Sequence, residues 1–302
     1  MQVRTDFPET PFTWPEARER GIRRWHLDAA VRERRVLRLY TGVYLRADVE
    51  QTPLVRAQAA ALVVTEHSVV CDRSAAWLHG VEVNRFRELD RVPALECYVL
   101  RGHDPIDRPE CGGGTRDLMP SDWTEIAGVK VTTPVRTAMD LGCKLSRREA
   151  LAAMDALARA HGITSGDMYR LLPRFFRRRG VVQLRELIPL VDGRAESSGE
   201  TWTRLEIKDR GLPSPTPQHW VSVDGVPTYR LDLAYPHARI AVEYDGEEFH
   251  SSPEARERDR VRRQWLRDHG WTVIVLDKTS FTEEAIITWI GQLREALGLP
   301  VR

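Results

Sequence analysis

Two apolar stretches joined by a Pro-His-Ala-Arg connection place the strongest constraint on the fold of this 302-residue chain. Residues 229–235 (YRLDLAY) and 239–244 (RIAVEY) are typical of strands, and a connection of this length predicts a β-hairpin. Asp232 then lies opposite Glu243, and directly opposed residues of an antiparallel pair share a face, with Cβ atoms roughly 4.5–5.5 Å apart. Asp245 follows two residues later and points to the same face. The pattern therefore predicts three neighbouring carboxylates on one sheet.

Three carboxylates embedded in apolar strands repel one another and lose hydration, so they require compensation. A divalent cation supplies it. Mg²⁺ (or Mn²⁺) prefers oxygen ligands, binds one or two carboxylates and fills its other positions with water and substrate phosphate. Such an arrangement predicts hydrolysis of a phosphodiester bond. The alternative is a solvated acidic end of a hairpin.

Glu200 is a candidate fourth acid with two interpretations. Ser197 and Glu200 have the spacing of a helix capping box, which explains both residues structurally. The adjoining hairpin also makes Glu200 a candidate metal ligand, and the two roles are compatible. Glu196, one turn earlier, is the substitute candidate.

The segment after the hairpin predicts a basic helix over residues 255–269 that ends at Gly270. Arg258 and Arg262 are candidate contacts to DNA phosphates, although pairing with acids three or four residues away explains them equally well. An apolar strand over 271–276 and an amphipathic C-terminal helix over 283–297 complete the expected elements of this region.

The first fifty residues are arginine-rich and predict two helices followed by a hairpin. The helices are expected at 14–20 and 23–35, and the hairpin at 36–47 turns at Thr41 and Gly42. Helix, helix and two-stranded ribbon is the order of a winged helix-turn-helix, which binds DNA. The candidate DNA contacts are Arg23, Arg24, His26 and Arg38.

The N-terminal segment, with its run LYTGVY, resembles the N-terminal domain of AbiEi-type antitoxins. The pieces DRSAAWLHG and TTPVRTAMDL resemble the middle part of the same proteins. These resemblances imply a winged helix at 1–50 and an α/β connecting domain at 51–190, which leaves 191–302 as a third domain. The triple glycine at 112–114 lacks the Lys-Ser/Thr of a phosphate-binding loop.

The C-terminal region resembles the very-short-patch-repair (Vsr-like) endonucleases of the PD-(D/E)xK superfamily. The resemblance covers about residues 196–276 and rests on the motifs that surround the acids. Its residues are Gly211-Leu212-Pro213, Gln218, Asp232, Glu243-Tyr244-Asp245-Gly246, His250, Asp259, Arg262 and Gly270-Trp271.

This resemblance implies an α/β/α sandwich around a mixed sheet and metal-dependent DNA cleavage. It makes Glu200 the first-helix acid, Asp232 the central metal ligand, and Glu243 and Asp245 the second-strand acids. Asp245 stands where the superfamily's lysine is expected, so the general base is open. His250 is the preferred candidate base, and Lys278 is the second choice.

We therefore expect a Mg²⁺-dependent DNA endonuclease that acts in DNA repair or defence. The alternative is an AbiEi-like antitoxin and transcriptional regulator whose nuclease-like domain is inactive. Four scattered cysteines and the absence of an apolar leader or membrane span predict a cytoplasmic protein. DNA is the expected partner; a homodimer and a toxin partner are open alternatives.

Overall fold

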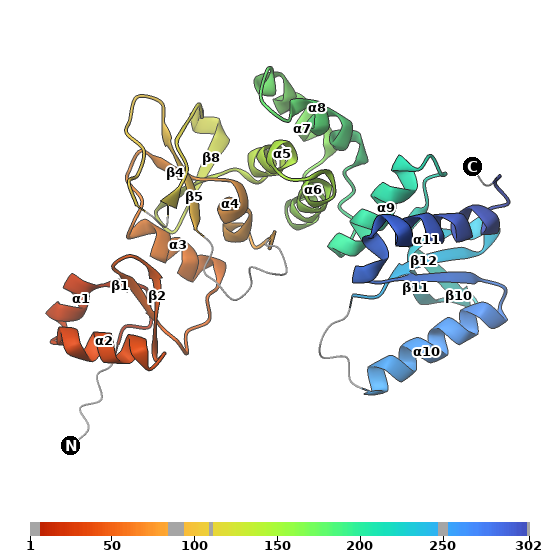
Figure 1. The fold of residues 1–302 in the computed structure, drawn as a ribbon, viewed down its shortest axis with the longest axis horizontal. Coiled ribbons are helices and arrows are strands. Elements are labelled where there is room, and N and C mark those ends of the chain that lie inside the picture. Colours follow the sequence, from red (N-terminus) through yellow and green to blue (C-terminus); the bar gives the residue numbers. More distant parts are fainter. Residues whose placement is uncertain (1–6, 84–93, 109–110, 247–252, 301–302) are drawn as a thin grey trace. The chain divides into compact units, whose positions relative to one another are not determined.

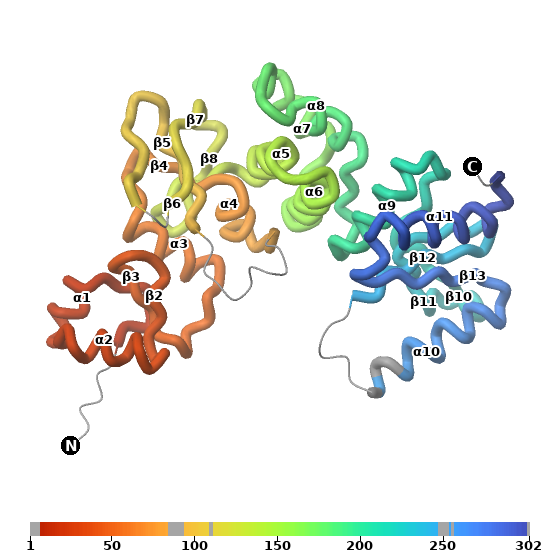
Figure 2. Tube along the Cα trace, in the orientation of Figure 1, coloured from red at the N-terminus to blue at the C-terminus, as the bar shows by residue number. Residues whose placement is uncertain are grey.

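The structure is a computed structural model that describes residues 7–83, 94–108, 111–246 and 253–300. The chain divides into two compact units, Met1–Lys144 with Gly166–Arg179 and Leu145–Ser165 with Gly180–Arg302. The described strands form three sheets, so the fold is mixed α/β (Figures 1 and 2). Across these residues, no helix combines the length and the apolar character needed to cross a membrane.

The N-terminal part of the first unit has the helices and the hairpin that its sequence predicts. Thr13 and Glu16 form a capping box at the start of the first helix, and Leu27 of the second helix is fully buried. The strands form a sheet in the order β1-β3-β2. The elements are β1 (Phe12–Thr13), α1 (Trp14–Glu19), α2 (Arg24–Arg32), β2 (Val36–Tyr40) and β3 (Val43–Arg46).

The remainder of the first unit contains a six-stranded sheet with short helices. The strands follow the order β6-β5-β4-β9-β8, and β7 pairs with β5. The elements are α3 (Pro53–Ala61), β4 (Ser68–Val70), α4 (Asp72–Leu78), β5 (Leu95–Leu100), β6 (Cys111–Gly112), β7 (Thr115–Arg116), β8 (Trp123–Ile126), β9 (Val129–Thr132), α5 (Pro134–Lys144) and α7 (Ser165–Leu171).

Residues 168–185 contain six arginines and no acid, and two of these arginines pair with buried aspartates elsewhere in the first unit. Asp122 and Asp140 are almost completely buried, and each forms ion pairs with arginines. Arg174 lies 2.6 Å from the Asp122 carboxylate, and Arg178 lies 2.6 Å from that of Asp140. Because a buried charge requires a partner, these two arginines are structural.

The second unit consists of helices packed on a four-stranded sheet. Helix α6 stops at Gly162, whose φ of 66° is the left-handed conformation that favours glycine at a helix end. The elements are α6 (Arg147–His161), α8 (Val181–Leu187), α9 (Ser198–Asp209), β10 (Thr216–Val223), β11 (Val226–Tyr235), β12 (Ile240–Tyr244), α10 (Pro253–Asp268), β13 (Thr272–Leu276) and α11 (Glu283–Ala296).

The sheet of the second unit is mixed and lies between two layers of helices, as expected for the C-terminal region. Its order is β10-β11-β12-β13, with antiparallel pairs except for the parallel pair β12–β13. One core cluster joins the sheet to α9 and α11, and a second cluster joins the other face to α10 (Figure 1). Helices α6 and α8 belong to the same compact unit as α9, α10 and α11.

The predicted register of the β11–β12 hairpin is correct, but the ladder ends one pair early. Leu233 pairs with Val242 and Tyr235 with Ile240, which is the register expected from the four-residue connection. Asp232 and Glu243 are not part of the ladder. Instead, the Asp232 carboxylate accepts a hydrogen bond of 2.9 Å from the backbone N–H of Tyr244.

The alternation of β11 also breaks at Asp232. Leu231 belongs to the core cluster that contacts α10, whereas Leu233 belongs to the cluster that contacts α9 and α11. In a regular strand these two residues would share a face. On the neighbouring strand, Gln218 stands at the corresponding position with a φ of 52°, which is rare for a residue other than glycine.

Candidate active site

Asp232 is the most perturbed acid of the predicted site. The pKa of its carboxyl is raised to about 7, chiefly by burial; the Tyr244 N–H and Arg262 oppose the rise, and the carboxylates of Glu200 and Glu243 add to it. Neighbouring acids therefore act on Asp232 from both α9 and β12. A carboxyl in this environment is an established feature of functional sites.

Glu200 and Gln218 complete the surroundings of Asp232 on the α9 side. Glu200 is 7% exposed, and its carboxylate accepts hydrogen bonds from Gln218 Nε2 at 2.8 Å and from the backbone N–H of Glu196 at 3.0 Å. The Oε1 atom of Gln218 is buried and finds no hydrogen-bond partner among the described residues. Two carboxylates and an unpaired amide oxygen form a donor set that suits Mg²⁺ or Mn²⁺.

The predicted capping box at the start of α9 is half correct. The Ser197 hydroxyl accepts a hydrogen bond of 3.2 Å from the Glu200 backbone N–H, as expected for the helix cap. The Glu200 carboxylate, however, binds the N–H of Glu196 rather than that of Ser197. The Glu200 carboxylate therefore accepts hydrogen bonds from both the Glu196 N–H and the Gln218 amide.

Glu243 is neutralised by arginines of α10. It is 2% exposed, and both its oxygens bind the Arg262 guanidinium at 2.7 and 2.9 Å. Arg263 approaches the same carboxylate at 3.4 Å and binds Asp245 at 2.9 Å. Asp259 of the same helix binds both arginines, at 2.9 and 2.8 Å, so these side chains form one ion-pair network.

Arginines of α10 bind two of the three acids of the expected cluster, Glu243 and Asp245. Asp232 is acted on by Glu243 from β12 and by Glu200, which Gln218 binds, from α9. Within the described ranges, no three His, Cys, Asp or Glu side chains are grouped so that they could hold a metal ion. The metal-ligand roles of these acids stay predictions.

The candidate bases and the substitute acid have separate positions. His250 lies outside the described residues. Lys278 is exposed in the 3₁₀ turn Lys278–Phe281 that follows β13. Glu196 binds Arg230 at 2.6 Å.

The candidate DNA contacts differ in their partners. Arg23 and Arg258 are exposed, Arg24 pairs with Asp28 at 3.2 Å, and Arg38 donates to the Thr41 hydroxyl at 2.9 Å. The ring of His26 is tilted by 37° against that of Trp25, with ring centroids 3.5 Å apart. Arg262 is different because Glu243 and Asp259 occupy its guanidinium.

Sequence reasoning gave Gln218 no role and did not consider Trp220 or Arg230. Gln218 belongs to the motif set of the C-terminal resemblance, but only its hydrogen bond to Glu200 places it at the site. Trp220 and Arg230 are register partners in β10 and β11. What distinguishes Trp220 is its exposure near acidic residues, and a sequence does not reveal which side chains are exposed.

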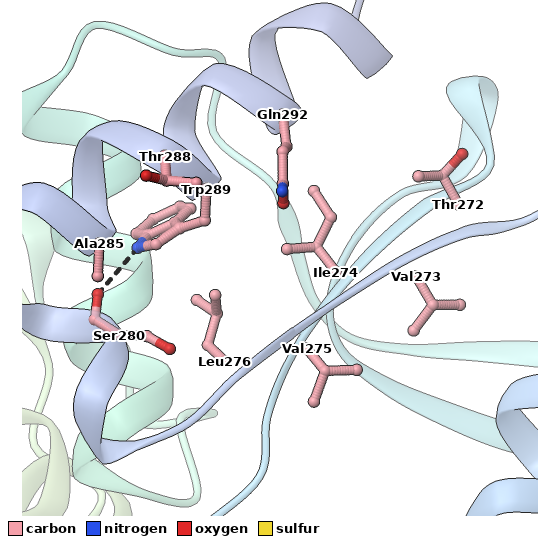
Figure 3. Close-up of a pocket in the computed structure, with 10 residues that line it drawn as sticks. All are labelled: Thr272, Val273, Ile274, Val275, Leu276, Ser280, Ala285, Thr288, Trp289 and Gln292. Atoms are coloured by element: carbon pink, nitrogen blue, oxygen red, sulfur yellow. Dashed lines mark hydrogen bonds between the residues drawn. The ribbon is translucent and has the colours of Figure 1, made fainter.

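A groove of about 540 Å³ lies between β13 and α11 (Figure 3). Ile274 and Leu276 of the strand face Trp289 of the helix, whose indole N–H donates to the Ser280 carbonyl at 3.1 Å. Thr288 adds a polar group to the lining. No predicted site residue lines this groove.

Comparisons with known proteins agree with this architecture. Residues 207–297 match the restriction endonuclease-like family REase_MTES_1575, and residues 68–190 match the AbiEi antitoxin C-terminal domain. Two relatives are the uncharacterized proteins MT2308 and Rv2248 of the Mycobacterium tuberculosis strains CDC 1551 / Oshkosh and ATCC 25618 / H37Rv. Each is 32% identical over 253 residues, which cover 83% of this chain and 89% of the relative.

The two matched segments contain most of the structure described above. The AbiEi-like segment begins at β4, and the endonuclease-like segment begins near the end of α9 and continues through α11. The chain therefore belongs to the family of the mycobacterial proteins MT2308 and Rv2248, and it carries an AbiEi antitoxin C-terminal domain segment followed by a restriction endonuclease-like domain.

Proposed function

We propose that this protein is a metal-dependent DNA endonuclease whose site is built on Asp232, Glu200 and Gln218. The observation that carries the proposal is the buried Asp232 beside Glu200, with the Oε1 atom of Gln218 left unpaired among the described residues. Asp232 and Gln218 lie within the segment 207–297 that matches restriction endonuclease-like proteins, and Glu200 lies just before it. Buried polar atoms are normally paired, so an unpaired amide oxygen on a side chain that binds Glu200 supports a role as a ligand donor.

Asp232 and Glu200 would hold the cation, with Gln218 Oε1 as a third oxygen donor. When bound, Mg²⁺ or Mn²⁺ supplies stabilisation of the negative charge that develops on the phosphodiester. The Tyr244 N–H fixes one carboxylate oxygen of Asp232, and Gln218 Nε2 fixes Glu200. The Arg262–Glu243 pair holds α10 against β12 and keeps this edge of the site rigid. His250 stays the candidate base.

The N-terminal part would bind DNA as a winged helix. Its helices α1 and α2 precede the β2–β3 hairpin, an order that supports a winged helix, and the exposed Arg23 lies at the start of α2. Arg24, His26 and Arg38 are the other proposed contacts. Arginines of this kind act mainly on phosphates, which position a protein on a duplex without reading its sequence.

A transcriptional regulator with an inactive nuclease-like domain is the second candidate. It is favoured by the AbiEi antitoxin match over residues 68–190 and by the arginines that occupy Glu243 and Asp245. In this case the carboxylates would serve the fold alone. The protein would bind a promoter duplex and cut no DNA.

A cleavage assay separates the two candidates. We expect the wild type to nick or cut DNA with Mg²⁺ or Mn²⁺, and Asp232→Asn to lower the rate more than about 100-fold, because even supporting residues of metal ligands contribute 10- to 100-fold. The matched control is Asp268→Asn, which removes an exposed carboxylate of α10 and leaves the rate unchanged. Mg²⁺ should also raise the melting temperature of the wild type more than that of Asp232→Asn.

The regulator hypothesis predicts the opposite result. Wild type and Asp232→Asn would be equally inert on single-stranded, duplex and branched DNA, and both would bind one promoter tightly. A folded wild type with that behaviour would overturn the endonuclease proposal. Circular dichroism of each variant shows whether the comparison is between folded proteins.

A further inference from the structure

Trp220 is an exposed tryptophan on β10, beside the proposed site. Its side chain is 51% exposed, although tryptophan is usually well buried. Its register partner on β11 is Arg230, whose guanidinium carbon lies 5.9 Å from the centre of the indole ring. This is within the range of a cation–π contact.

The Trp220–Arg230 pair lies on the same side of the sheet as the proposed metal ligands. Arg230 binds Glu196 at 2.6 Å, just before α9, and Gln218 binds Glu200 at 2.8 Å in the first turn of α9. The opposite face is identified by Leu231, which packs in the cluster that contacts α10.

Two parallel rows of side chains therefore cross the sheet next to each other. The first row contains Gln218 and Asp232; the second contains Trp220, two residues after Gln218 on β10, and Arg230, two residues before Asp232 on the antiparallel β11. Two residues of a regular strand span roughly 7 Å, which gives the scale of the separation between neighbouring rows. A strand whose phosphate lies at Asp232 would bring its neighbouring nucleotide to Trp220.

An exposed indole beside a guanidinium is suited to a nucleobase. Aromatic side chains stack on bases of any sequence, and arginine adds a cation–π contribution and a phosphate contact. Such stacking requires a base with a free face. In a continuous duplex both faces are covered by neighbouring base pairs, so the platform selects nucleotides that are unpaired or displaced.

We propose that Trp220 and Arg230 receive an unpaired base next to the scissile phosphate, so that the substrate is DNA with single-stranded nucleotides at the cut. The assignment rests on the proposed endonuclease function, which it makes more specific. Trp220 stacks on the base. Arg230, which is anchored by its ion pair with Glu196, holds the indole ring in place. Continuous duplex DNA is then a poorer substrate than gapped or flapped DNA.

Binding without cleavage tests the assignment on the full-length protein. Fluorescence anisotropy in EDTA compares one labelled duplex with the same duplex carrying a short single-stranded gap. Loss of one base stack weakens binding about 5- to 150-fold, so we expect Trp220→Ala to lose this much affinity for the gapped DNA and less than about twofold for the duplex. Trp220→Phe, which keeps an aromatic face, should restore most of the affinity.

The matched control is Ile287→Ala, which truncates an apolar side chain that is 59% exposed on α11. It should bind both DNAs as the wild type does. Equal losses on gapped and duplex DNA for Trp220→Ala would overturn base stacking. A change from dimer to monomer with unaltered DNA binding would also overturn it and would make β10 a subunit contact.

Cleavage assays keep this inference distinct from the proposed function. A wild type that cuts DNA and prefers continuous duplex overturns the substrate assignment and leaves the endonuclease standing. A wild type that cuts nothing, but binds gapped DNA through Trp220, overturns the endonuclease and leaves the stacking platform. Absence of DNA binding by the folded wild type overturns both.

Discussion

Glu243 shows how one residue acquires a different partner from the one that its sequence context indicates. Its strand places it among apolar residues, where a carboxylate requires a positive charge. A metal ion and an arginine satisfy that requirement equally well at the level of sequence. In the structure Arg262 binds both oxygens of Glu243, in the planar two-bond geometry that arginine provides.

Arg262→Ala is expected to destabilise the protein by about 3 kcal/mol. Removal of one partner leaves Glu243 buried and unpaired, which is the costly way to break a buried ion pair; Arg263 keeps the loss near the lower end of the usual range. Urea denaturation measures the loss. The matched control is Arg260→Ala on the same helix, whose partner Glu257 is exposed, and its unfolding midpoint should not change.

The same pair of variants separates structure from DNA contact at Arg262. At a temperature where Arg262→Ala is folded, we expect its duplex affinity to equal that of the wild type, because Glu243 and Asp259 occupy the guanidinium. A loss of affinity with unchanged stability would restore Arg262 as a phosphate contact, as its position on a basic helix first predicted.

The residues of the candidate site could be predicted from the sequence more fully than their grouping. Asp232 and Glu200 act on one another as expected. The grouping with Glu243 and Asp245 depended on regular alternation along β11, and that alternation fails between Leu231 and Leu233. The positive φ of Gln218 marks the irregularity on the neighbouring strand, and a glutamine gives no warning of it.

At the scale of elements, local rules account for most of what the sequence predicts correctly. The register of β11 with β12 follows from the length of the connection, and the ends of α6 and α10 follow from Gly162 and Gly270. Packing between distant elements is different. The amphipathic α6 could have joined either unit, and only tertiary contacts assign it to the second.

Asp155 is one of the contacts that join α6 to α9. It is 1% exposed and binds the Thr201 hydroxyl at 2.8 Å and Arg204 at 2.6 Å, both on α9. The backbone N–H of Asp192 donates to its other oxygen at 2.8 Å. Burial raises the pKa of Asp155 to about 6, and Arg204 and these hydrogen bonds only partly oppose that rise.

The stability difference between Asp155→Asn and the wild type should therefore depend on pH. Because the folded protein holds the Asp155 proton more tightly than the unfolded chain, the wild type loses stability relative to the variant as pH rises from about 4 to 6. A shift of about two pKa units corresponds to about 3 kcal/mol. Urea denaturation at pH 4, 5, 6 and 7 measures this difference directly.

Asp268→Asn, on the exposed side of α10, is measured in parallel as the effect of removing a carboxyl from the same unit. The prediction would be contradicted if the stability of the wild type relative to Asp155→Asn stayed constant across this range, or if it increased as pH rises. It would mean that Arg204 outweighs burial and holds Asp155 ionised.

At the scale of the whole molecule, the chain combines two segments with different known relatives. The AbiEi-like match begins at β4, after the helices and the hairpin of the N-terminal part, and the endonuclease-like match covers the four-stranded sheet. In the proposed function the first part holds the DNA and the second cuts it. Binding and cleavage should then respond to different substitutions.

The double variant Arg23→Gln/Arg38→Gln tests this division of roles. Each lost phosphate contact lowers the slope of log affinity against log salt concentration by about 0.9, so two contacts lower it by about 1.8. Measurements of duplex affinity at several salt concentrations between about 50 and 200 mM give this slope. The single-turnover cleavage rate at saturating protein should stay unchanged, because Asp232 and Glu200 are intact in the other unit.

Arg101→Gln is the matched control, since Arg101 is 77% exposed in the same unit as Arg23 and is not a proposed DNA contact. Its salt slope should equal that of the wild type. An unchanged slope in the double variant would show that Arg23 and Arg38 do not contact DNA phosphates. Each lost phosphate contact means that fewer counterions are released on binding, and the slope must then change. A cleavage rate that falls at saturating protein would show instead that the N-terminal part takes part in the cutting step, and the separation of holding from cutting would then be wrong.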